Sequence, residues 1–174
     1  MTLAELCEAA MTRSDNTAGN LILRSLGGPA FATAFARSLG DKMTRLDRWE
    51  TDLNEATPGD PRDTTTPSAM APLLRKLLLE KQLSRKSREQ LIAWLVANTT
   101  GDARLRAGLP SDRRIADKTG TGERGTANDI AAIWPPQRKP FVVSVFVTDT
   151  KASLAVRNAK IASIGREVTQ LARE

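Results

Sequence analysis

Glu50 and Asn54 stand four residues apart inside a polar segment that runs from Thr44 to Thr66. On one helical turn this spacing puts a carboxylate and an amide on the same face. Together the two groups could hold one water, with the carboxylate accepting its proton and the amide orienting it. An exposed glutamate beside a turn asparagine has the same spacing, so the pair alone leaves both interpretations open.

Two further clusters carry side chains that could take part in chemistry: Ser14-Asp15-Asn16 and Lys118-Thr119-Gly120. Each also has an ordinary structural interpretation. Ser-Asp-Asn is typical of a turn or a helix cap, and Lys-Thr-Gly is typical of a strand that ends in a turn. Taken singly, none of the three groups of residues specifies a function.

The composition narrows the possible chemistry, because the chain contains no His, no Tyr and one Cys, at position 7. A general base must therefore be Glu, Asp or Lys. Ser-His-Asp triads and His-ligated metals are excluded, and no zinc-ligand pattern is present. The net charge of +6 is spread along the chain without interleaved aromatic residues, so we expect a solvated surface and no nucleic-acid partner.

The 174 residues, of which 40% are hydrophobic, are enough for a packed core in one domain or in two small lobes that share an interface. No apolar run reaches the length of about 18 residues that a membrane span needs. The first residues lack the basic and apolar regions of a secretory signal. We therefore expect no membrane partner and no signal peptide in this chain.

Apolar periodicity predicts a helical block followed by a small sheet and a last helix, which is an α+β fold. Residues 1–110 form the block and contain a long polar connection at 44–66; residues 111–174 form a three-stranded antiparallel meander covered by the terminal helix. Helices are expected at 2–11, about 18–25, 31–39, from Thr66-Pro67 onward, 87–97, briefly at 102–107, and 154–172. Strands are expected at 114–118, 129–134 and 141–147, the last buried on both faces, with Gly120, Gly122 and Gly125 in a turn.

In combination the clusters are specific, because S-D-N and K-T-G accompany an S-x-x-K nucleophile in class A β-lactamases and penicillin-binding proteins. The chain resembles class A serine β-lactamases from Met1 to Glu174. The matching stretches are 12–18, 44–50 with 53–55, 63–67 and 117–122. The resemblance implies hydrolysis of β-lactam small molecules through a serine acyl-enzyme, without metal or other cofactor.

The resemblance also implies roles for single residues in acylation. Ser14 would relay a proton to the β-lactam nitrogen, Asn16 would hold the active-site lysine and the substrate amide, and Lys118 would attract the substrate carboxylate. Thr119 would bond that carboxylate, and the backbone N–H of Thr121 would be an oxyanion donor. The substrate-binding set is completed by Gly120 and by Arg104, for which a surface arginine is the alternative.

For deacylation, the resemblance implies that Glu50 with Asn54 activates the hydrolytic water. A salt bridge between Arg48 and Asp63 would close the Ω-shaped loop around them. Replacing Arg48 with Ala would then loosen this segment and lower deacylation more than acylation.

No serine of the chain is followed by Lys three residues later, so the S-x-x-K nucleophile is not among these residues. The resemblance therefore indicates the C-terminal portion of a β-lactamase with an incomplete fold, and a Cys7 parted from its usual partner. We expect residues 141–147 to form an exposed apolar edge, and the chain alone to be marginally folded, inactive, and restored by the missing N-terminal segment. The full-length family member would be periplasmic or secreted.

Two alternative functions remain at this point. A penicillin-binding transpeptidase or carboxypeptidase would share the clusters but lack the deacylating pair, so Glu50 with Asn54 argues against it. A non-catalytic fragment that only binds substrate is favoured by the absent nucleophile. The sequence does not rank β-lactams, although Gly122 and Glu123, by the strand edge, would affect the access of cephalosporins.

Overall fold

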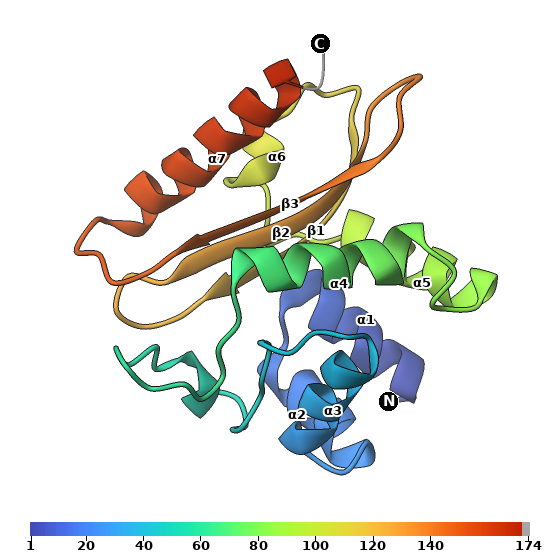
Figure 1. Cartoon of the computed structure of the whole chain (residues 1–174), viewed down its shortest axis with the longest axis vertical. Coiled ribbons are helices and arrows are strands. Elements are labelled where there is room, and N and C mark those ends of the chain that lie inside the picture. Colours follow the sequence, from blue (N-terminus) through green and yellow to red (C-terminus); the bar gives the residue numbers. More distant parts are fainter. Residues whose placement is uncertain (172–174) are drawn as a thin grey trace.

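A computed structural model describes residues 1–171 and places a three-stranded sheet between two layers of helices (Figure 1). The elements, in chain order, are α1 Leu3–Arg13, α2 Asn16–Ser25, α3 Pro29–Ser38, a 3-10 turn η1 Asp52–Asn54, α4 Pro67–Leu79, α5 Arg85–Val96, α6 Leu105–Gly108, β1 Arg114–Thr121, β2 Ala127–Trp134, β3 Phe141–Val147 and α7 Leu154–Leu171. The predicted end of the last helix, Ala172, lies outside the described residues. The α+β class is confirmed.

Local signals explain where several helices begin. Thr2 forms the expected capping box with Glu5: the Thr2 side chain accepts from the Glu5 N–H, and the Glu5 carboxylate accepts from the Thr2 N–H. Thr66 caps α4 through the Ala69 N–H, with Pro67 in the first turn. Such caps satisfy N–H groups that have no partner inside the helix.

The sheet has the order β1-β2-β3 with both pairs antiparallel, so the predicted meander is confirmed. The predicted end of the first strand at Lys118 is wrong, because β1 continues to Thr121. Thr119, Gly120 and Thr121 pair with residues 127–129 of β2, and the turn begins only at Gly122. The substrate-binding candidates therefore lie on a strand.

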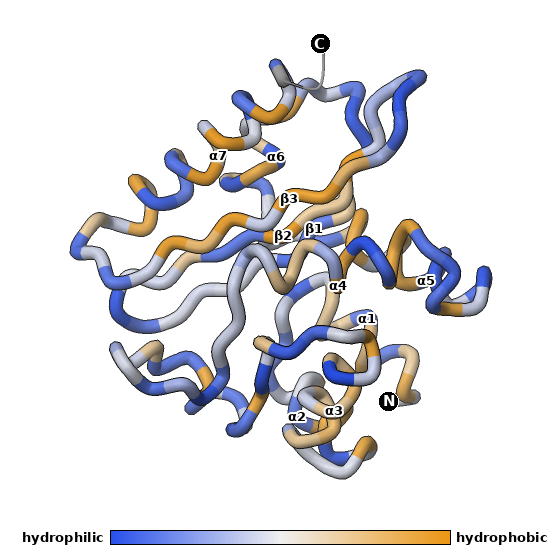
Figure 2. Tube along the Cα trace, viewed as in Figure 1, coloured by the Kyte–Doolittle hydropathy of each residue, from blue (hydrophilic) through white to orange (hydrophobic). Residues whose placement is uncertain are grey.

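Alternation along the strands divides the apolar core into two layers. Ile115 packs in the layer beneath α6 and α7, and its neighbour Ala116 packs in the layer against α4 and α5. Ala131 and Ile133 of β2 face the first layer, and Ala132 faces the second. This is the period of two that a sheet covered on both faces requires, and Figure 2 shows the apolar strands between the helices.

β3 is the last strand of the sheet, and this position changes its burial. We predicted a strand buried on both faces, but Val143 alone is buried and the other six residues are half-buried. A strand with one neighbour is shielded by helices α4 and α7 from above and below and lacks a second strand beside it. An apolar edge of this kind is open to pairing with another strand.

A close approach of α6 and α7 positions the residue that precedes α6. A Cβ at Gly108 would lie 2.0 Å from the Ala162 carbonyl oxygen, and one at Gly165 would lie 2.7 Å from the Leu105 carbonyl oxygen. Only glycine permits this spacing. Arg104, at the start of α6, is thereby held against the end of β1.

The segment 44–66 connects α3 to α4 and contains no regular element except the turn η1. Figure 1 shows it to one side of the sheet, beside α1–α3, and Figure 2 shows that it is mainly hydrophilic. Within residues 1–171, no helix combines the length and apolarity that crossing a membrane requires.

Candidate active site

The turn between α1 and α2 presents Ser14 toward the sheet. Ser14 has left-handed backbone dihedrals, φ 54° and ψ 43°, and Asp15 caps α2 by accepting from the Ala18 N–H at 2.8 Å. The N–H and the hydroxyl of Thr99 both donate to the Thr12 carbonyl, at 2.9 and 3.0 Å. The cap expected as the plain interpretation is therefore present, and it orients Ser14 without excluding a chemical role.

Lys118 of β1 lies beside Ser14 although the two residues are 104 positions apart. The Lys118 ammonium donates to the Ser14 hydroxyl oxygen, and also to the Thr119 carbonyl at 2.9 Å. Burial lowers the pKa of Lys118, against the opposing charges of Asp117 and Asp129. Because the Ser14 oxygen accepts from Lys118, the Ser14 hydrogen remains available to another acceptor.

The outer edge of β1 offers backbone donors. The Gly122 N–H donates to the Thr126 carbonyl across the β1–β2 hairpin. Since successive N–H groups of a strand point to opposite sides, the Thr121 N–H points away from β2. In the described sheet β1 has no other neighbour, so this donor is open to a ligand.

Arg104 lies behind that edge and is 4% exposed, so its interpretation as a surface arginine is wrong. Its guanidinium donates to the carbonyls of Gly120 (2.8 Å) and Asn128, to the Thr121 hydroxyl oxygen (2.6 Å) and to the Asn158 side-chain oxygen (3.0 Å). Burial lowers the pKa of Arg104. The arginine thus joins the end of β1 to β2 and α7.

A buried charge network beneath β1 was missed by sequence reasoning. Asp117 is 0% exposed, and its carboxylate accepts from Arg106 Nε at 2.6 Å and from Asn98 Nδ2 at 2.8 Å. Burial raises the pKa of Asp117, while Arg106 and Asn98 oppose that rise. An acid within the otherwise apolar run 115–117 was the available signal, and its partners lie on other elements.

Asp129 of β2 is the second fully buried acid of this region. One of its oxygens accepts from the Leu105 N–H at 3.0 Å, and the other has no protein donor. Burial and the nearby charge of Asp117 raise the pKa of Asp129 to about 7. It therefore binds a proton in the folded chain well above the pH at which an exposed aspartate would.

Glu50 and Asn54 form the opposite wall of the site at the turn η1. Asn54 Nδ2 donates to the Glu50 carboxylate at 2.6 Å and to the Thr51 carbonyl at 3.1 Å. The Asn20 side chain of α2 holds the Glu50 main chain: Asn20 Nδ2 donates to the Glu50 carbonyl and Asn20 Oδ1 accepts from the Glu50 N–H, each at 2.9 Å. The peptide bond between Glu50 and Thr51 is cis. Sequence reasoning missed Asn20, which lies 30 residues away.

Arg48 closes the segment 44–66 through two carboxylates. Its Nε lies 2.6 Å from Asp63 Oδ2, and its Nη1 lies 2.5 Å from Glu55 Oε2. The second Asp63 oxygen accepts the N–H groups of Asp47 (2.7 Å) and Arg48 (3.0 Å). The Asp63 side chain is 2% exposed, so a carboxylate inside the loop binds its two ends together.

These walls enclose a cavity of about 300 Å³. Its lining includes the predicted residues Ser14, Asn16, Glu50, Asn54, Arg104, Lys118, Thr119, Gly120 and Thr121, together with Asp15, Gly19 and Thr100, to which we had assigned no role. Arg48 and Asp63 stand outside it, behind the Glu50 wall. A carboxylate hydrogen-bonded to an amide thus faces a hydroxyl beside an ammonium and an open strand edge.

Comparison with known proteins shows the family of the chain. A family model described as the β-lactamase enzyme family matches residues 1–172. The chain belongs to the class A β-lactamases. The β-lactamase AST-1 of Nocardia asteroides is 55% identical over 168 residues, which are 97% of this chain and 54% of that protein.

Solved class A β-lactamases have the same fold as this chain. The ancestral class A β-lactamase GNCA is 65% identical with a TM-score of 0.97, over 98% of this chain and 66% of that one. A class A β-lactamase of the last common ancestor of Gram-negative bacteria, GNCA4, is 63% identical with a TM-score of 0.96, over 98% and 65%. The chain therefore spans about half the length of the curated β-lactamase and about two thirds of the solved ones.

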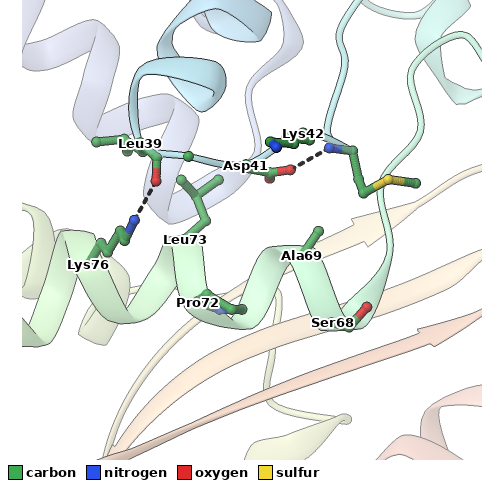
Figure 3. A pocket seen from close by; sticks show the side chains of 10 residues that line it. Leu39, Asp41, Lys42, Ser68, Ala69, Pro72, Leu73 and Lys76 are labelled. Atoms are coloured by element: carbon green, nitrogen blue, oxygen red, sulfur yellow. Dashed lines mark hydrogen bonds between the residues drawn. The ribbon is translucent and has the colours of Figure 1, made fainter.

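A second hollow of this class A β-lactamase chain lies between α4 and the loop after α3, and has a volume of about 320 Å³ (Figure 3). Its two cations and one acid are Lys42, Lys76 and Asp41. The Lys76 ammonium donates to the Leu39 carbonyl, and the Asp41 carboxylate accepts from the Met43 N–H at 2.8 Å. None of the candidate residues lines this hollow, whereas nine of them line the cavity at Ser14 and Glu50, so we assign the chemistry to that cavity.

Proposed function

We propose that this chain supplies the proton-relay, carboxylate-binding and water-activating parts of an active site that hydrolyses β-lactam antibiotics through a serine acyl-enzyme. The observation that carries the proposal is that Glu50 with Asn54 and Ser14 with Lys118 line one cavity. The first pair serves deacylation and the second serves acylation. Family membership supports the same reaction.

In the acylation half, Ser14 gives its free hydrogen to the β-lactam nitrogen as the ring opens. Lys118, beside it, attracts the substrate carboxylate, which the Thr119 and Thr121 hydroxyls approach from β1. The Thr121 N–H stabilises the oxyanion, because a preoriented donor at developing charge is a main source of catalysis. Arg104 acts from behind by fixing Thr121 at 2.6 Å.

In the deacylation half, Glu50 accepts a proton from the water that attacks the acyl-enzyme. The Asn54 amide nitrogen donates to the Glu50 carboxylate and to the Thr51 carbonyl. The side-chain oxygen of Asn54 is therefore the group left to orient that water. Asn16 borders the same cavity and would contact the substrate amide. Asn20 and Arg48 position this wall without touching the substrate.

The acylating serine in this proposal comes from an S-x-x-K segment outside these 174 residues, because no serine here has Lys three positions later. The chain then acts together with that segment. The whole protein would work in the periplasm or outside the cell, where β-lactams reach it.

The test adds the S-x-x-K-bearing segment of a class A relative to this chain and measures hydrolysis of a chromogenic cephalosporin. Glu50→Gln should lower turnover by roughly 10²–10⁴-fold, the range for a lost general base, and accumulate an acyl-enzyme in the mass spectrum. Glu89→Gln, an exposed site on α5, is the control and should behave as the unmodified chain.

Other outcomes would select a different function. A stable penicillin adduct in the unmodified complemented protein would indicate a penicillin-binding transpeptidase. Penicillin binding without adduct or turnover, in a complemented protein that folds, would indicate a substrate-binding remnant.

A further inference from the structure

Thr100 lines the cavity but has no role in the reaction described above. Its hydroxyl oxygen lies 2.5 Å from the Thr119 hydroxyl oxygen and 2.7 Å from Asn98 Oδ1. Two oxygens at such distances share a hydrogen, because each contact is within hydrogen-bond range. The two contacts therefore need two hydrogens, and the side chains of Asn98, Thr100 and Thr119 have to supply both.

The buried acid Asp117 determines which way Asn98 points. Asn98 Nδ2 lies 2.8 Å from Asp117 Oδ2, and Arg106 pairs with the other oxygen of that carboxylate. An ionised carboxylate accepts hydrogen bonds and donates none, so the Asn98 amide nitrogen faces Asp117. Asn98 Oδ1 then faces Thr100 as an acceptor, and it also accepts the Thr100 N–H at 3.0 Å.

The two hydroxyl hydrogens are consequently both committed. The Thr100 hydrogen fills the contact with Asn98 Oδ1, so the contact between Thr100 and Thr119 is filled by the Thr119 hydrogen. Thr119 presents lone pairs to the cavity and has no hydrogen left for an anion.

The hydroxyl hydrogen of Thr121, two residues along the same strand, is free, in contrast to that of Thr119. Its hydroxyl oxygen accepts from Arg104 Nη2 at 2.6 Å, so its hydrogen is free to point into the cavity. Ser14 resembles Thr121, because its oxygen accepts from Lys118.

We propose that Thr100 is a specificity-determining residue that withholds the Thr119 hydroxyl from anionic ligands. The carboxylate of a β-lactam meets Lys118, Ser14 and Thr121 first. It recruits Thr119 only when two hydroxyls reverse: the Thr119 hydrogen turns to the carboxylate and the Thr100 hydrogen turns to Thr119. Asn98 Oδ1 then keeps the Thr100 N–H alone. The inference rests on the proposed function, since it takes the substrate carboxylate to bind at Lys118.

The experiment titrates benzylpenicillin, and separately its methyl ester, into the full 174-residue chain and its variants, followed by NMR. Thr100→Val removes the acceptor that holds the Thr119 hydrogen, so it should tighten benzylpenicillin binding about threefold to tenfold, the worth of one ordinary hydrogen bond. Affinity for the ester, which has no carboxylate charge, should stay unchanged. Thr100→Ser retains the hydroxyl and should bind as the unmodified chain does.

Thr99→Val is the matched control, because the neighbouring Thr99 hydroxyl donates to the Thr12 carbonyl and takes no part in the hydrogen bonds of Thr100 and Thr119. Its affinity for benzylpenicillin should equal that of the unmodified chain. Thr100→Ala provides a second variant without the hydroxyl, and NMR spectra establish that each variant is folded. Unchanged or weaker benzylpenicillin binding by both Thr100→Val and Thr100→Ala would overturn the role of Thr100 and leave the proposed function standing. Absence of benzylpenicillin binding by the unmodified chain, in a spectrum that shows it folded, would overturn the carboxylate site at Lys118 and with it the role of Thr100, while the hydrolysis test of the complemented chain decides the proposed function separately.

Discussion

The two walls of the cavity are held in different ways. The β1 wall is positioned from beneath by Arg104, Arg106, Asp117 and Asp129, among which both aspartates are fully buried. The Glu50 wall belongs to a segment whose ion pairs, apart from Asp63, are partly open to solvent. Buried charges that lose a partner are costly, whereas exposed pairs contribute little.

This contrast separates the two halves of the proposed reaction. Of the acylation groups, Lys118, Thr119 and Thr121 lie on a strand between two apolar layers, so they can be displaced only by disrupting the core. The deacylation pair lies on a segment with few apolar contacts, which is the kind of region that opens locally below the global unfolding free energy. We expect substitutions in the first wall to unfold the chain and substitutions in the second to change one reaction step.

The largest effect is expected from Arg106→Ala, which leaves the buried Asp117 carboxylate without its ion pair. Removing one partner of a buried pair typically costs about 3–5 kcal/mol. Urea denaturation should show a loss of that size in the free energy of unfolding. Arg85→Ala, which breaks an exposed pair with Glu89, is the control and should leave the transition nearly in place. Equal small losses in both variants would contradict the contrast between buried and exposed pairs.

A pH-dependent effect is expected from Asp129. Burial raises the pKa of Asp129 to about 7 in the folded chain, whereas an unfolded aspartate has a pKa of about 3.9. Between these values the folded chain binds one more proton than the unfolded chain, so its stability falls as the pH rises from about 4 to 7. The slope from this group reaches about 1.4 kcal/mol per pH unit.

Asp129→Asn removes this titration and should flatten that part of the pH profile. Urea denaturation at pH 5 and pH 8 checks it: relative to the unmodified chain, the variant should gain stability at pH 8. Parallel profiles for the two proteins would show that Asp129 is ionised across the range.

An intermediate and local effect is expected from Arg48→Ala. The variant leaves Asp63, 2% exposed, with backbone donors alone. Hydrogen exchange should accelerate within residues 44–66 while β1 and β2 keep their protection. In the complemented enzyme, deacylation should fall about tenfold or more while acylation is retained, because misplacement of a positioned group affects its own step.

Arg48→Lys is the matched control for charge, because it keeps the positive charge of Arg48. One ammonium cannot reproduce both the Asp63 and the Glu55 contacts, so this variant separates the charge of Arg48 from its geometry. Equal losses of acylation and deacylation in Arg48→Ala would argue against separate walls.

The smallest effect is expected from Arg45→Ala, which breaks the pair with Asp47 in the same segment. The two side chains are 40% and 25% exposed, and salt screens such a pair. Denaturation curves of the variant and the unmodified chain should coincide at 0.5 M salt, a concentration at which the screening length is only about 3–10 Å. A clear loss at high salt would mean that this pair orders the loop as Arg48 does.

Several features of the fold could be predicted because they depend on neighbours in the chain. The capping box at Thr2, the start of α4 at Thr66-Pro67 and the β3 range 141–147 all follow from local residue types. The motif residues Ser14, Glu50 and Lys118 were identified in the same way, by type and spacing. The extension of β1 to Thr121 was missed, because Gly120 is a turn signal unless a paired strand overrides it.

By itself the sequence determined which groups are available for chemistry: a carboxylate with an amide four residues on, a serine in a turn and a lysine in a predicted strand. Only the tertiary structure decided that these groups share one cavity, that the Asn20 side chain hydrogen-bonds the Glu50 main chain 30 residues away, and that Asp117 orients Asn98. The reason is physical. Side-chain type and local spacing are properties of the chain, but burial and the direction of a hydrogen bond depend on partners brought from distant elements.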